Sequence, residues 1–412
     1  MMKAYERFLD NYASLIVGAG VNIQEGQLLV IASPIECSDF ARRIAKKAYE
    51  CGAKDVVMNW RDELFSKIRF LGAPEEVFGE FPDWQKEYYK FYTDKGAAFI
   101  SIAANDPELL KDVDPKRIAM VQKTNSIALA EHRDKLMSNE NAWCVVSVPT
   151  VAWAKKVFPE YSAEQAVDAL WGAILTSVRA NEDDPTAAWD KHKKALRSRM
   201  AFLNKYDFRR LRYQNSLGTD LIVGLPEGHQ WLGGAEETKQ GVEFIANIPT
   251  EEVFTLPHKE EVDGIVYSSK PLNYQGNLID RFSLTFEKGK VVACSAEVGQ
   301  AVLENLIATD DGAARLGEVA LVPFDSPISN SNILFYNTLF DENASCHLAF
   351  GKAYPVCLKG GEEMDKDALD KAGVNDSLVH VDFMIGTKDL SIDGQTADGE
   401  WVAVFRNGNF VE

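Results

Sequence analysis

Apolar and polar positions follow two different periods in the first half of the chain. Residues 27–33 form a short apolar run, and residues 36–49 then place apolar side chains at helical spacing, with Arg and Lys on the other side. Gly52 ends this segment, and a second apolar run covers residues 55–60. A strand, a helix and a strand within about 30 residues predict a βαβ unit, and hence a parallel sheet.

More segments of both kinds follow in this part of the chain. Apolar runs at residues 97–103 and 142–148 predict two further strands. Charge-laced segments predict helices over residues 74–93, 115–137, 163–181 and 187–203. The first half therefore has the alternation of strands and helices that is typical of α/β domains.

The pattern changes near residue 206, where short alternating runs separated by Gly, Asn, Asp and Pro begin. Antiparallel strands are predicted for residues 220–224, 282–286, 290–294, 379–385 and 401–405. We therefore expect an α/β protein with two domains. The N-terminal domain, residues 1–195, should be a parallel-sheet α/β domain, and the C-terminal domain, residues 196–412, should be α+β and largely antiparallel.

Acidic residues outnumber basic ones, with 62 Asp and Glu against 44 Lys and Arg and a formal net charge of −18. A phosphate backbone attracts clusters of Lys and Arg, so this charge argues against nucleic acid and anionic membrane surfaces as partners, while it permits the binding of cations. No apolar run reaches the roughly 18 residues of a membrane span, and the N-terminus has no secretory signal pattern. We expect a cytoplasmic protein.

Two motifs resemble ligand sites but lack the flanking elements that those sites need. Gly18 and Gly20 begin like a dinucleotide fingerprint, but they precede the first predicted strand instead of following it. Residues 389–400 nearly fit a calcium loop, with Ser391 at the third position. Such a calcium loop lies between two helices, whereas both flanks here alternate like strands. We therefore interpret residues 389–400 as an ordinary loop.

Two polar residues share one face of the predicted strand at residues 379–385. Because side chains alternate along a strand, His380 and Asp382 point to one side, and Val381 and Phe383 point to the other. Burial of two adjacent polar groups is costly unless they are paired or bind a metal ion. The segment fits a metal site, and it equally fits a hydrogen-bonded His–Asp pair in a structural core.

Single polar residues occur in three other apolar segments of the same half. His347 lies among small and apolar residues, Glu318 heads an apolar run, and Glu251 and Glu252 follow a Pro-fixed turn. Each has an ordinary interpretation: a buried His is commonly bonded to a backbone carbonyl, and a single Glu can be a solvated acid at a strand end. Together with the His–Asp strand, however, they bring two His, one Asp and two or three Glu into one domain.

Mixed imidazole and carboxylate ligation suits zinc, cobalt or manganese, and five such side chains exceed what one catalytic zinc ion needs. We interpret the set as a two-metal hydrolytic site, in which a carboxylate and a water molecule bridge the two ions.

Linked motifs run through the chain in a fixed order, at residues 247–255, 316–320, 347–355 and 380–386, with further matches at 149–154 and 405–408. These motifs resemble the family of leucyl-type metallo-aminopeptidases known as aminopeptidase T, AmpS and PepS. The resemblance spans nearly the whole chain. It implies a two-domain α/β subunit whose C-terminal domain binds metal, a homodimer, and short peptides as substrates of an exopeptidase.

The resemblance also implies a set of site residues. The family's metal ligands fall on Glu252, Glu318, His347, His380 and Asp382, with two divalent ions per subunit. Zinc or cobalt is expected, with magnesium or manganese as alternatives. Glu251 is the alternative to Glu252, because the two acids are adjacent and only one needs to point into the site. The family's active-site tyrosine falls on Tyr354.

The implied roles leave some alternatives open. Glu318 is expected to act as the general base or as a bridging ligand, and Tyr354 to donate a hydrogen bond to the tetrahedral oxyanion. The ordinary interpretation of Tyr354 is a residue packed against Pro355 at a strand end. Two other functions fit the same residues: a noncatalytic metal- or peptide-binding protein of this fold, and a two-metal hydrolase of another amide.

Overall fold

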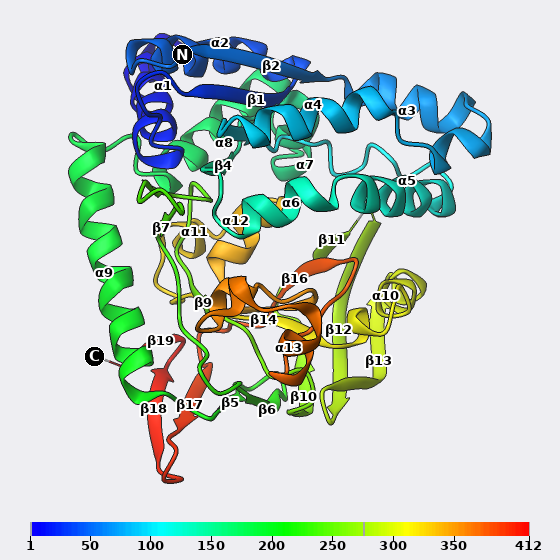
Figure 1. The fold of residues 1–412 in the computed structure, drawn as a ribbon, viewed down its shortest axis with the longest axis vertical. Coiled ribbons are helices and arrows are strands. Elements are labelled where there is room, and N and C mark those ends of the chain that lie inside the picture. Colours follow the sequence, from blue (N-terminus) through cyan, green and yellow to red (C-terminus); the bar gives the residue numbers. More distant parts are fainter. Residues whose placement is uncertain (1, 275–276, 412) are drawn as a thin grey trace. The chain divides into compact units, whose positions relative to one another are not determined.

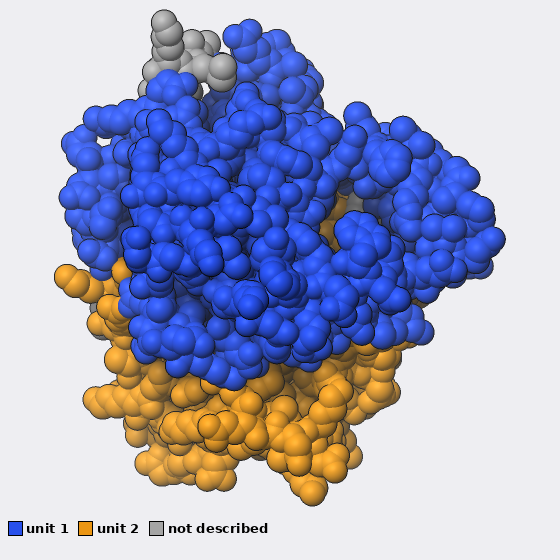
Figure 2. Space-filling model, turned by 45° about the horizontal axis from the view of Figure 1, so that its top comes forward, with its two compact units in different colours: residues 1–191, 235–249, 334–339 blue, residues 192–234, 250–333, 340–412 orange. Residues whose placement is uncertain are grey.

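Two units with separate cores make up the chain. The computed structural model describes residues 2–274 and 277–411. Unit 1 comprises residues 1–191, 235–249 and 334–339, and unit 2 comprises residues 192–234, 250–333 and 340–412 (Figure 2). Each unit therefore combines segments that lie far apart in the sequence. The division into independent domains at residue 195 stays a prediction.

A four-stranded parallel sheet forms the centre of unit 1 (Figure 1). Its strands are β1 (Leu28–Pro34), β2 (Asp55–Arg61), β3 (Ala98–Ile102) and β4 (Trp143–Val146), in the order β2-β1-β3-β4. All three pairings are parallel, as the βαβ pattern predicted. β1 and β3 are almost wholly buried, which explains why they appear in the sequence as continuous apolar runs.

Eight helices of unit 1 connect and flank these strands (Figure 1). They are α1 (Met2–Leu15), α2 (Ser38–Glu50), α3 (Glu63–Gly72), α4 (Asp83–Asp94), α5 (Pro115–Ala128), α6 (Ala130–Met137), α7 (Val151–Val157) and α8 (Ala163–Ser177). A two-stranded ribbon, β7 (Glu236–Glu237) with β8 (Glu243–Phe244), belongs to the same unit. The unit boundary at 191/192 falls within α9 (Pro185–Tyr206).

The predicted helix over residues 74–93 is wrong in its first half. The structure has a five-residue 3-10 helix at Glu75–Gly79, and α4 begins only at Asp83. Pro82 accounts for the break, because it lacks a backbone N–H and forces the preceding residue out of the helical region. The expected helix at 115–137 is likewise divided into α5 and α6 at Leu129.

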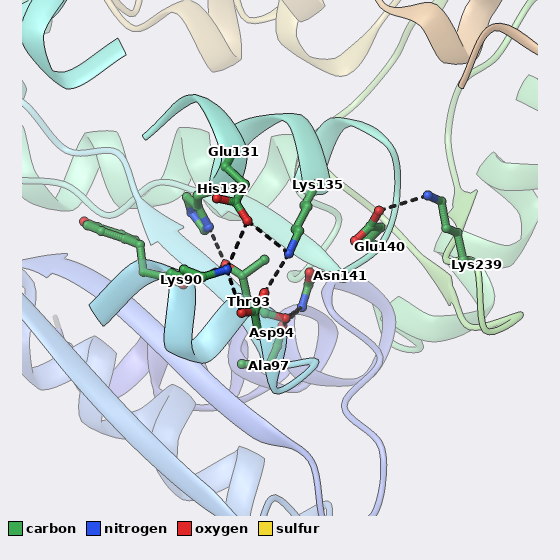
Figure 3. Close-up of polar contacts among 11 residues, drawn as sticks. Lys90, Thr93, Asp94, Ala97, Glu131, His132, Lys135, Glu140, Asn141 and Lys239 are labelled. Carbon is green, nitrogen blue, oxygen red and sulfur yellow. Dashed lines mark hydrogen bonds and ion pairs between the residues drawn. The ribbon is translucent and has the colours of Figure 1, made fainter. Parts of the chain in front are cut away.

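A polar cluster joins α4 to α6 inside unit 1 (Figure 3). Lys135 Nζ lies 2.6 Å from Asp94 Oδ1, and Lys90 Nζ lies 3.0 Å from Asp94 Oδ2 and 3.1 Å from Glu131 Oε1. Beneath these ion pairs, Nδ1 of His132 lies 2.6 Å from the hydroxyl of Thr93. The ion pairs are largely exposed, so we attribute little stability to them individually.

A large antiparallel sheet forms one layer of unit 2, which confirms the predicted change of sheet type (Figure 1). Eight strands follow the order β11-β12-β10-β6-β5-β17-β18-β19, and β13 pairs with β12. Their bounds are β5 (Arg210–Gln214), β6 (Asp220–Gly224), β10 (Val262–Tyr267), β11 (Leu272–Tyr274), β12 (Asn277–Glu287), β13 (Lys290–Val298), β17 (Ser391–Gln395), β18 (Trp401–Arg406) and β19 (Asn409–Phe410).

A smaller antiparallel sheet forms the second layer of unit 2. Its order is β16 (His380–Met384), β15 (His347–Gly351), β14 (Leu316–Leu321) and β9 (Val253–Thr255). One apolar core contains side chains of both sheets, including Phe282 of β12 and Phe383 of β16, whose ring centroids are 5.7 Å apart. The small sheet therefore turns one face to the core and leaves its other face for polar residues.

Shorter helices complete the chain. They are α10 (Gln300–Ile307), α11 (Pro327–Asn330), α12 (Thr338–Asp341) and α13 (Lys366–Lys371). β17 runs through the calcium-like segment 389–400, and Gly18 and Gly20 lie in a π-helical turn before β1, so both rejected motifs lack the required flanking elements. Among the described residues, no helix is both long and apolar enough to cross a membrane.

Candidate metal centre

The strand register of the small sheet brings the five predicted ligands to one face. Glu318 pairs across the ladder with Ala349, which pairs with Asp382, and His380 is two residues before Asp382 on the same strand. His347 lies two residues before Ala349. Side chains at directly opposed and at i, i+2 positions share a face, so these four ligands point to the same side.

The fifth predicted ligand, Glu252, joins this face from β9. Phe254 of β9 pairs with Ala320, which lies two residues after Glu318, and Glu252 lies two residues before Phe254. The opposite face carries Val319, Leu348 and Phe383 in one row, and all three belong to the core. The alternation of side chains along the four strands therefore gives the small sheet two different faces. One face carries the candidate ligands, and we call it the chemical face; the other packs against the core.

Two overlapping groups of potential ligand atoms occur in the described part of the chain, each within 4.8 Å. One contains Glu252, Glu318 and His347, and the other contains Glu318, His380 and Asp382. Glu318 belongs to both groups.

The two carboxylate oxygens of Glu318 face different histidines. Its Oε1 lies 3.4 Å from Nε2 of His347, and its Oε2 lies 3.6 Å from Nε2 of His380. Nε2 of His347 is also 3.0 Å from Oε2 of Glu252, and Nε2 of His380 is 3.3 Å from Oδ1 of Asp382. This arrangement suits one carboxylate bridging two cations, each with a further imidazole and a further carboxylate.

Backbone carbonyls fix the orientation of both imidazoles. Nδ1 of His347 lies 3.1 Å from the carbonyl oxygen of Ser345, and Nδ1 of His380 lies 2.7 Å from that of Lys352. A carbonyl oxygen can only accept a hydrogen bond, so Nδ1 carries a proton in each ring. Nε2 therefore faces the carboxylates, as in metal sites whose histidines donate their other N–H to a second-shell acceptor.

Two buried carboxylate oxygens depend on the protonation of a histidine for their hydrogen bonds. Among the described residues, Oε2 of Glu252 and Oδ1 of Asp382 meet an imidazole Nε2 at 3.0 and 3.3 Å, and they have no hydrogen-bond donor when that nitrogen carries no proton. Unsatisfied buried oxygens are costly, and a bound cation is a common explanation for them. The donor set of imidazole and carboxylate groups thus fits a divalent metal ion.

The electrostatics of the cluster respond to its crowded charges. Burial lowers the pKa of His380, but Asp382 and Glu318 outweigh it and raise this pKa to about 9. Burial also acts to lower the pKa of His347. The carboxylates of Glu252 and Glu318 outweigh burial and raise this pKa well above its usual range. The cluster therefore retains positive charge between its acids, and a metal ion competes with these protons for Nε2.

Small residues keep the chemical face open. Ala349 and Ala320 occupy its middle, between longer side chains. Gly317 lies at a bulge of β14, and a Cβ atom there would come within 2.3 Å of the carbonyl oxygen of Gly351 and 2.5 Å of that of Lys352. Glycine at 317 thus allows the close approach of the two strands that carry Glu318 and His347.

The adjacent acids Glu251 and Glu252 have different surroundings. Oε2 of Glu251 lies 3.6 Å from Nε2 of His192, and its backbone N–H donates to Oδ1 of Asn343 at 2.7 Å. Glu252 reaches His347 instead. The geometry therefore favours Glu252 over Glu251 as the candidate ligand.

Tyr354 lies three residues after the end of β15, beside the cluster. Its ring centroid is 4.6 Å from that of His380 and 6.2 Å from that of Phe254. Burial and then the charges of Glu318 and Asp382 raise the pKa of Tyr354 well above its ordinary value. Its hydroxyl consequently keeps its proton and can donate a hydrogen bond.

Glu342 is a candidate that the sequence pattern did not indicate. It lies in a one-turn 3-10 helix, Glu342–Ala344, and is buried. Burial, followed by the charges of Asp382 and Glu252, raises the pKa of Glu342 well above its usual range. Nδ2 of Asn343 donates to its Oε1 at 3.3 Å. In the sequence Glu342 lies five residues before His347, between Asp341 and Asn343, so no apolar context singles it out.

The chain is similar to known metalloproteases over nearly its full length. The profile of the family described as thermophilic metalloprotease (M29) matches residues 5–410. Aminopeptidase 2 of Geobacillus stearothermophilus is 53% identical over 409 residues, with 99% of each chain covered. Aminopeptidase AmpS of Bacillus subtilis is 49% identical over 99% of this chain and 100% of its own.

Solved structures add a comparison of the fold. Wild-type AmpT from Thermus thermophilus superposes with a TM-score of 0.92 at 40% identity, covering 99% of this chain and 100% of that one. A 2,5-dihydroxypyridine dioxygenase from Pseudomonas putida KT2440 reaches a TM-score of 0.50 at 10% identity, covering 98% and 96%, and shares the fold alone. By its full-length sequence match and its close relatives, the chain belongs to the M29 family of thermophilic metalloproteases.

Proposed function

We propose that this protein is a two-metal aminopeptidase that removes N-terminal residues from short peptides. By family it is a metalloprotease and therefore a hydrolase. The observation that carries the proposal is the position of Glu318, which belongs to both ligand groups. Action at the N-terminus is supported by the aminopeptidase names of the full-length relatives.

Five residues would hold the two divalent ions: Glu252, Glu318, His347, His380 and Asp382. We propose zinc or cobalt, with magnesium or manganese as alternatives, because these metals accept mixed imidazole and carboxylate ligation. When bound, such ions lower the pKa of a water molecule toward neutrality and polarise the scissile carbonyl.

The charge of the buried cluster supports a pair of divalent ions. Glu252, Glu318, Glu342 and Asp382 carry four negative charges when ionised, and burial makes unpaired charges of this kind costly. Two divalent ions would balance them. Protons on the histidines perform part of this neutralisation when no metal is bound.

Glu318 serves as a bridging ligand in this proposal, and it also offers a proton acceptor. Its two oxygens face separate histidines, which suits bridging. Burial raises the pKa of Glu318 in the metal-free cluster, and bound cations would lower it again, so Glu318 would accept a proton from water only through an oxygen that is not bound to an ion. Glu342, also buried beside the cluster, offers a second acceptor for the same proton.

Tyr354 stabilises the tetrahedral oxyanion in the proposed reaction. A protonated phenol next to a metal centre donates a hydrogen bond that becomes stronger as charge develops on the carbonyl oxygen. Its packing against His380 and Phe254 holds the ring in place. An exopeptidase must also hold the free α-amine of its substrate, and we propose that a carboxylate of the cluster or one of the ions does so.

A peptide digest tests the function directly. Protein loaded with zinc or cobalt should release the first residue of an unblocked tripeptide but should leave its N-acetylated counterpart intact. A chelator should abolish release, and added metal should restore it. Binding without any cleavage would favour a noncatalytic protein of this fold, and cleavage of the acetylated peptide would favour a hydrolase of another amide.

A further inference from the structure

The ladder of the small sheet positions four of the five candidate ligands, but it does not include Glu252. The four lie within β14, β15 or β16 and have cross-strand partners: Glu318, His347, His380 and Asp382. The ladder of β9 begins one residue after Glu252, at Val253, which pairs with Leu321. The position of Glu252 therefore depends on contacts outside the ladder.

Asn343 contacts the backbone directly before Glu252. Its Oδ1 accepts a hydrogen bond from the backbone N–H of Glu251 at 2.7 Å, and both residues are buried, with 0% and 3% of their surfaces exposed. A buried backbone N–H needs an acceptor, which a neighbouring strand supplies elsewhere in the sheet. At Glu251 the side chain of Asn343 takes the place of that strand.

The amide group of Asn343 also contacts Glu342. Nδ2 of Asn343 donates to Oε1 of Glu342 at 3.3 Å, and Glu342 lies in the same 3-10 turn, five residues before His347. One side chain thus connects the segment that carries Glu252 with the segment that leads into β15. These two segments meet in the cluster, where Oε2 of Glu252 lies 3.0 Å from Nε2 of His347.

His192 of α9 fixes the preceding residue of the same segment. Its Nε2 lies 2.7 Å from the carbonyl oxygen of Thr250, which is also buried. Because a carbonyl oxygen can only accept a hydrogen bond, Nε2 of His192 carries a proton. Two side chains, those of His192 and Asn343, therefore hold the carbonyl of Thr250 and the N–H of Glu251, immediately before the candidate ligand Glu252.

We propose that Asn343 is a positioning residue of the metal centre, which sets the position of Glu252 relative to His347. This inference rests on the proposed two-metal function. The ligand group that contains Glu252 depends on the contact with Asn343, whereas the group that contains His380 consists of residues within the ladder. Loss of the Asn343 side chain should therefore weaken the binding of one ion and spare the other.

The metal affinity of Asn343→Ala tests the inference independently of turnover. Stripped protein would be titrated with zinc in competition with a chromophoric chelator. The Kd of one of the two equivalents should rise about 10–100-fold, as is typical when a group that orients a metal ligand is removed, and the Kd of the other should change about twofold or less. With cobalt as the probe, the visible absorption of one equivalent should change.

Asn343→Ser provides the same measurement if Asn343→Ala does not fold. Its hydroxyl group keeps some polarity at the buried position but is too short to make both contacts of the amide. The same loss of affinity for one equivalent is expected. Circular dichroism would establish that each variant is folded before its metal affinity is compared with that of the wild type.

Asn141→Ala is the matched control. Asn141 is also a buried asparagine, and its Nδ2 donates to the backbone carbonyls of Thr93 and Ala97 at 3.1 and 2.9 Å within unit 1 (Figure 3). Its loss should lower the unfolding temperature, since two buried carbonyls lose their donor, but both equivalents should keep a Kd within about twofold of the wild-type value.

The outcomes separate this inference from the proposed function. If the wild type binds two ions and a folded Asn343 variant binds both as tightly, the inference alone is overturned. An Asn141→Ala variant that loses metal to the same extent would also overturn it, because the effect would then be one of general stability. A wild type that binds no metal would overturn the proposed function together with the inference.

Discussion

Glu318 is the residue on which the proposed chemistry most depends. It emerges from a buried strand, its two oxygens point to two histidines, and its neighbours on the same face are two alanines. Glu318 is buried, so its carboxylate has little contact with solvent. Removal of its charge therefore alters the interactions within the buried cluster.

Glu318→Gln should therefore abolish turnover while the protein stays folded. The amide keeps the shape of the side chain but cannot bridge two cations or accept a proton, and losses of this kind reach about 10³-fold or more in kcat. Steady-state peptide hydrolysis, together with metal content and circular dichroism, would measure the effect. Glu287→Gln, at an exposed residue of β12, serves as the control; full activity in Glu318→Gln would remove Glu318 from the mechanism.

Tyr354→Phe removes only a hydroxyl group from beside the cluster. If that hydroxyl donates to the developing oxyanion, kcat should fall about 10²-fold while KM changes little, because the interaction forms mainly in the transition state. Kinetics on a tripeptide series would show this division. A higher KM with unchanged kcat would mean that Tyr354 contributes substrate packing instead.

The site residues differ in how well a sequence can indicate them. Period-two alternation placed His380 and Asp382 on one face, because that geometry holds for any strand. Glu342 escaped prediction because a single 3-10 turn has no periodicity, and its proximity to Asp382 and Glu252 arises only from the path of the chain in three dimensions. The choice of Glu252 over Glu251 likewise came from the resemblance and not from the pattern.

At the scale of the elements, β14 and β15 must approach each other closely at Gly317. Gly317→Ala would place a methyl group within 2.5 Å of two backbone carbonyls of β15 and the residue that follows it. We expect a loss of about 2–4 kcal/mol of unfolding free energy and weaker metal binding, since the strands that carry Glu318 and His347 must separate. Gly18→Ala, where a Cβ atom meets nothing within 4 Å, is the matched control for thermal unfolding; equal stability of the two variants would contradict this explanation.

His132 of α6, shown in Figure 3, should make the unfolding free energy depend on pH. Burial lowers the pKa of His132 to about 4, so the folded state resists a proton that the unfolded chain accepts near pH 6.5. Stability from this residue should be present above pH 6.5 and be lost as the pH falls toward 4. The loss should be about 1–2 kcal/mol, less than the full shift would give, because the ring is only partly buried.

Thermal unfolding between pH 4 and pH 7 would detect this loss. His132→Phe keeps a ring beside Tyr89 and Phe99 but cannot bind a proton. Its unfolding temperature should depend less on pH across this window than that of the wild type. Identical pH profiles would show that other groups cause the acid sensitivity.

The elements themselves were predicted unevenly. The predicted bounds of β2 and β6 lie within one residue of those observed. β6 alternates between exposed and buried positions, and β2 is a short run of mainly apolar residues after the turn at Gly52, although none of its residues is buried. α3 was not predicted, since its apolar face is turned to solvent and its segment lacks the usual contrast between a core face and a polar face.

At the scale of the whole molecule, composition and fold constrain function to different degrees. A net charge of −18 argued against nucleic acid but did not indicate where cations would bind. The fold alone is shared with a dioxygenase of 10% identity, so it does not determine the reaction. The functional argument therefore rests on the polar residues of the small sheet and on membership of the M29 family.

A metal titration of stripped protein tests the central claim, a centre of two ions, most directly. Chelator-treated protein would be titrated with zinc or cobalt while bound metal and release of the N-terminal residue of a tripeptide are measured in parallel. We predict no activity without metal and a plateau at two equivalents per chain. A plateau at one equivalent, or full activity in metal-free protein, would contradict a two-metal centre built around Glu318.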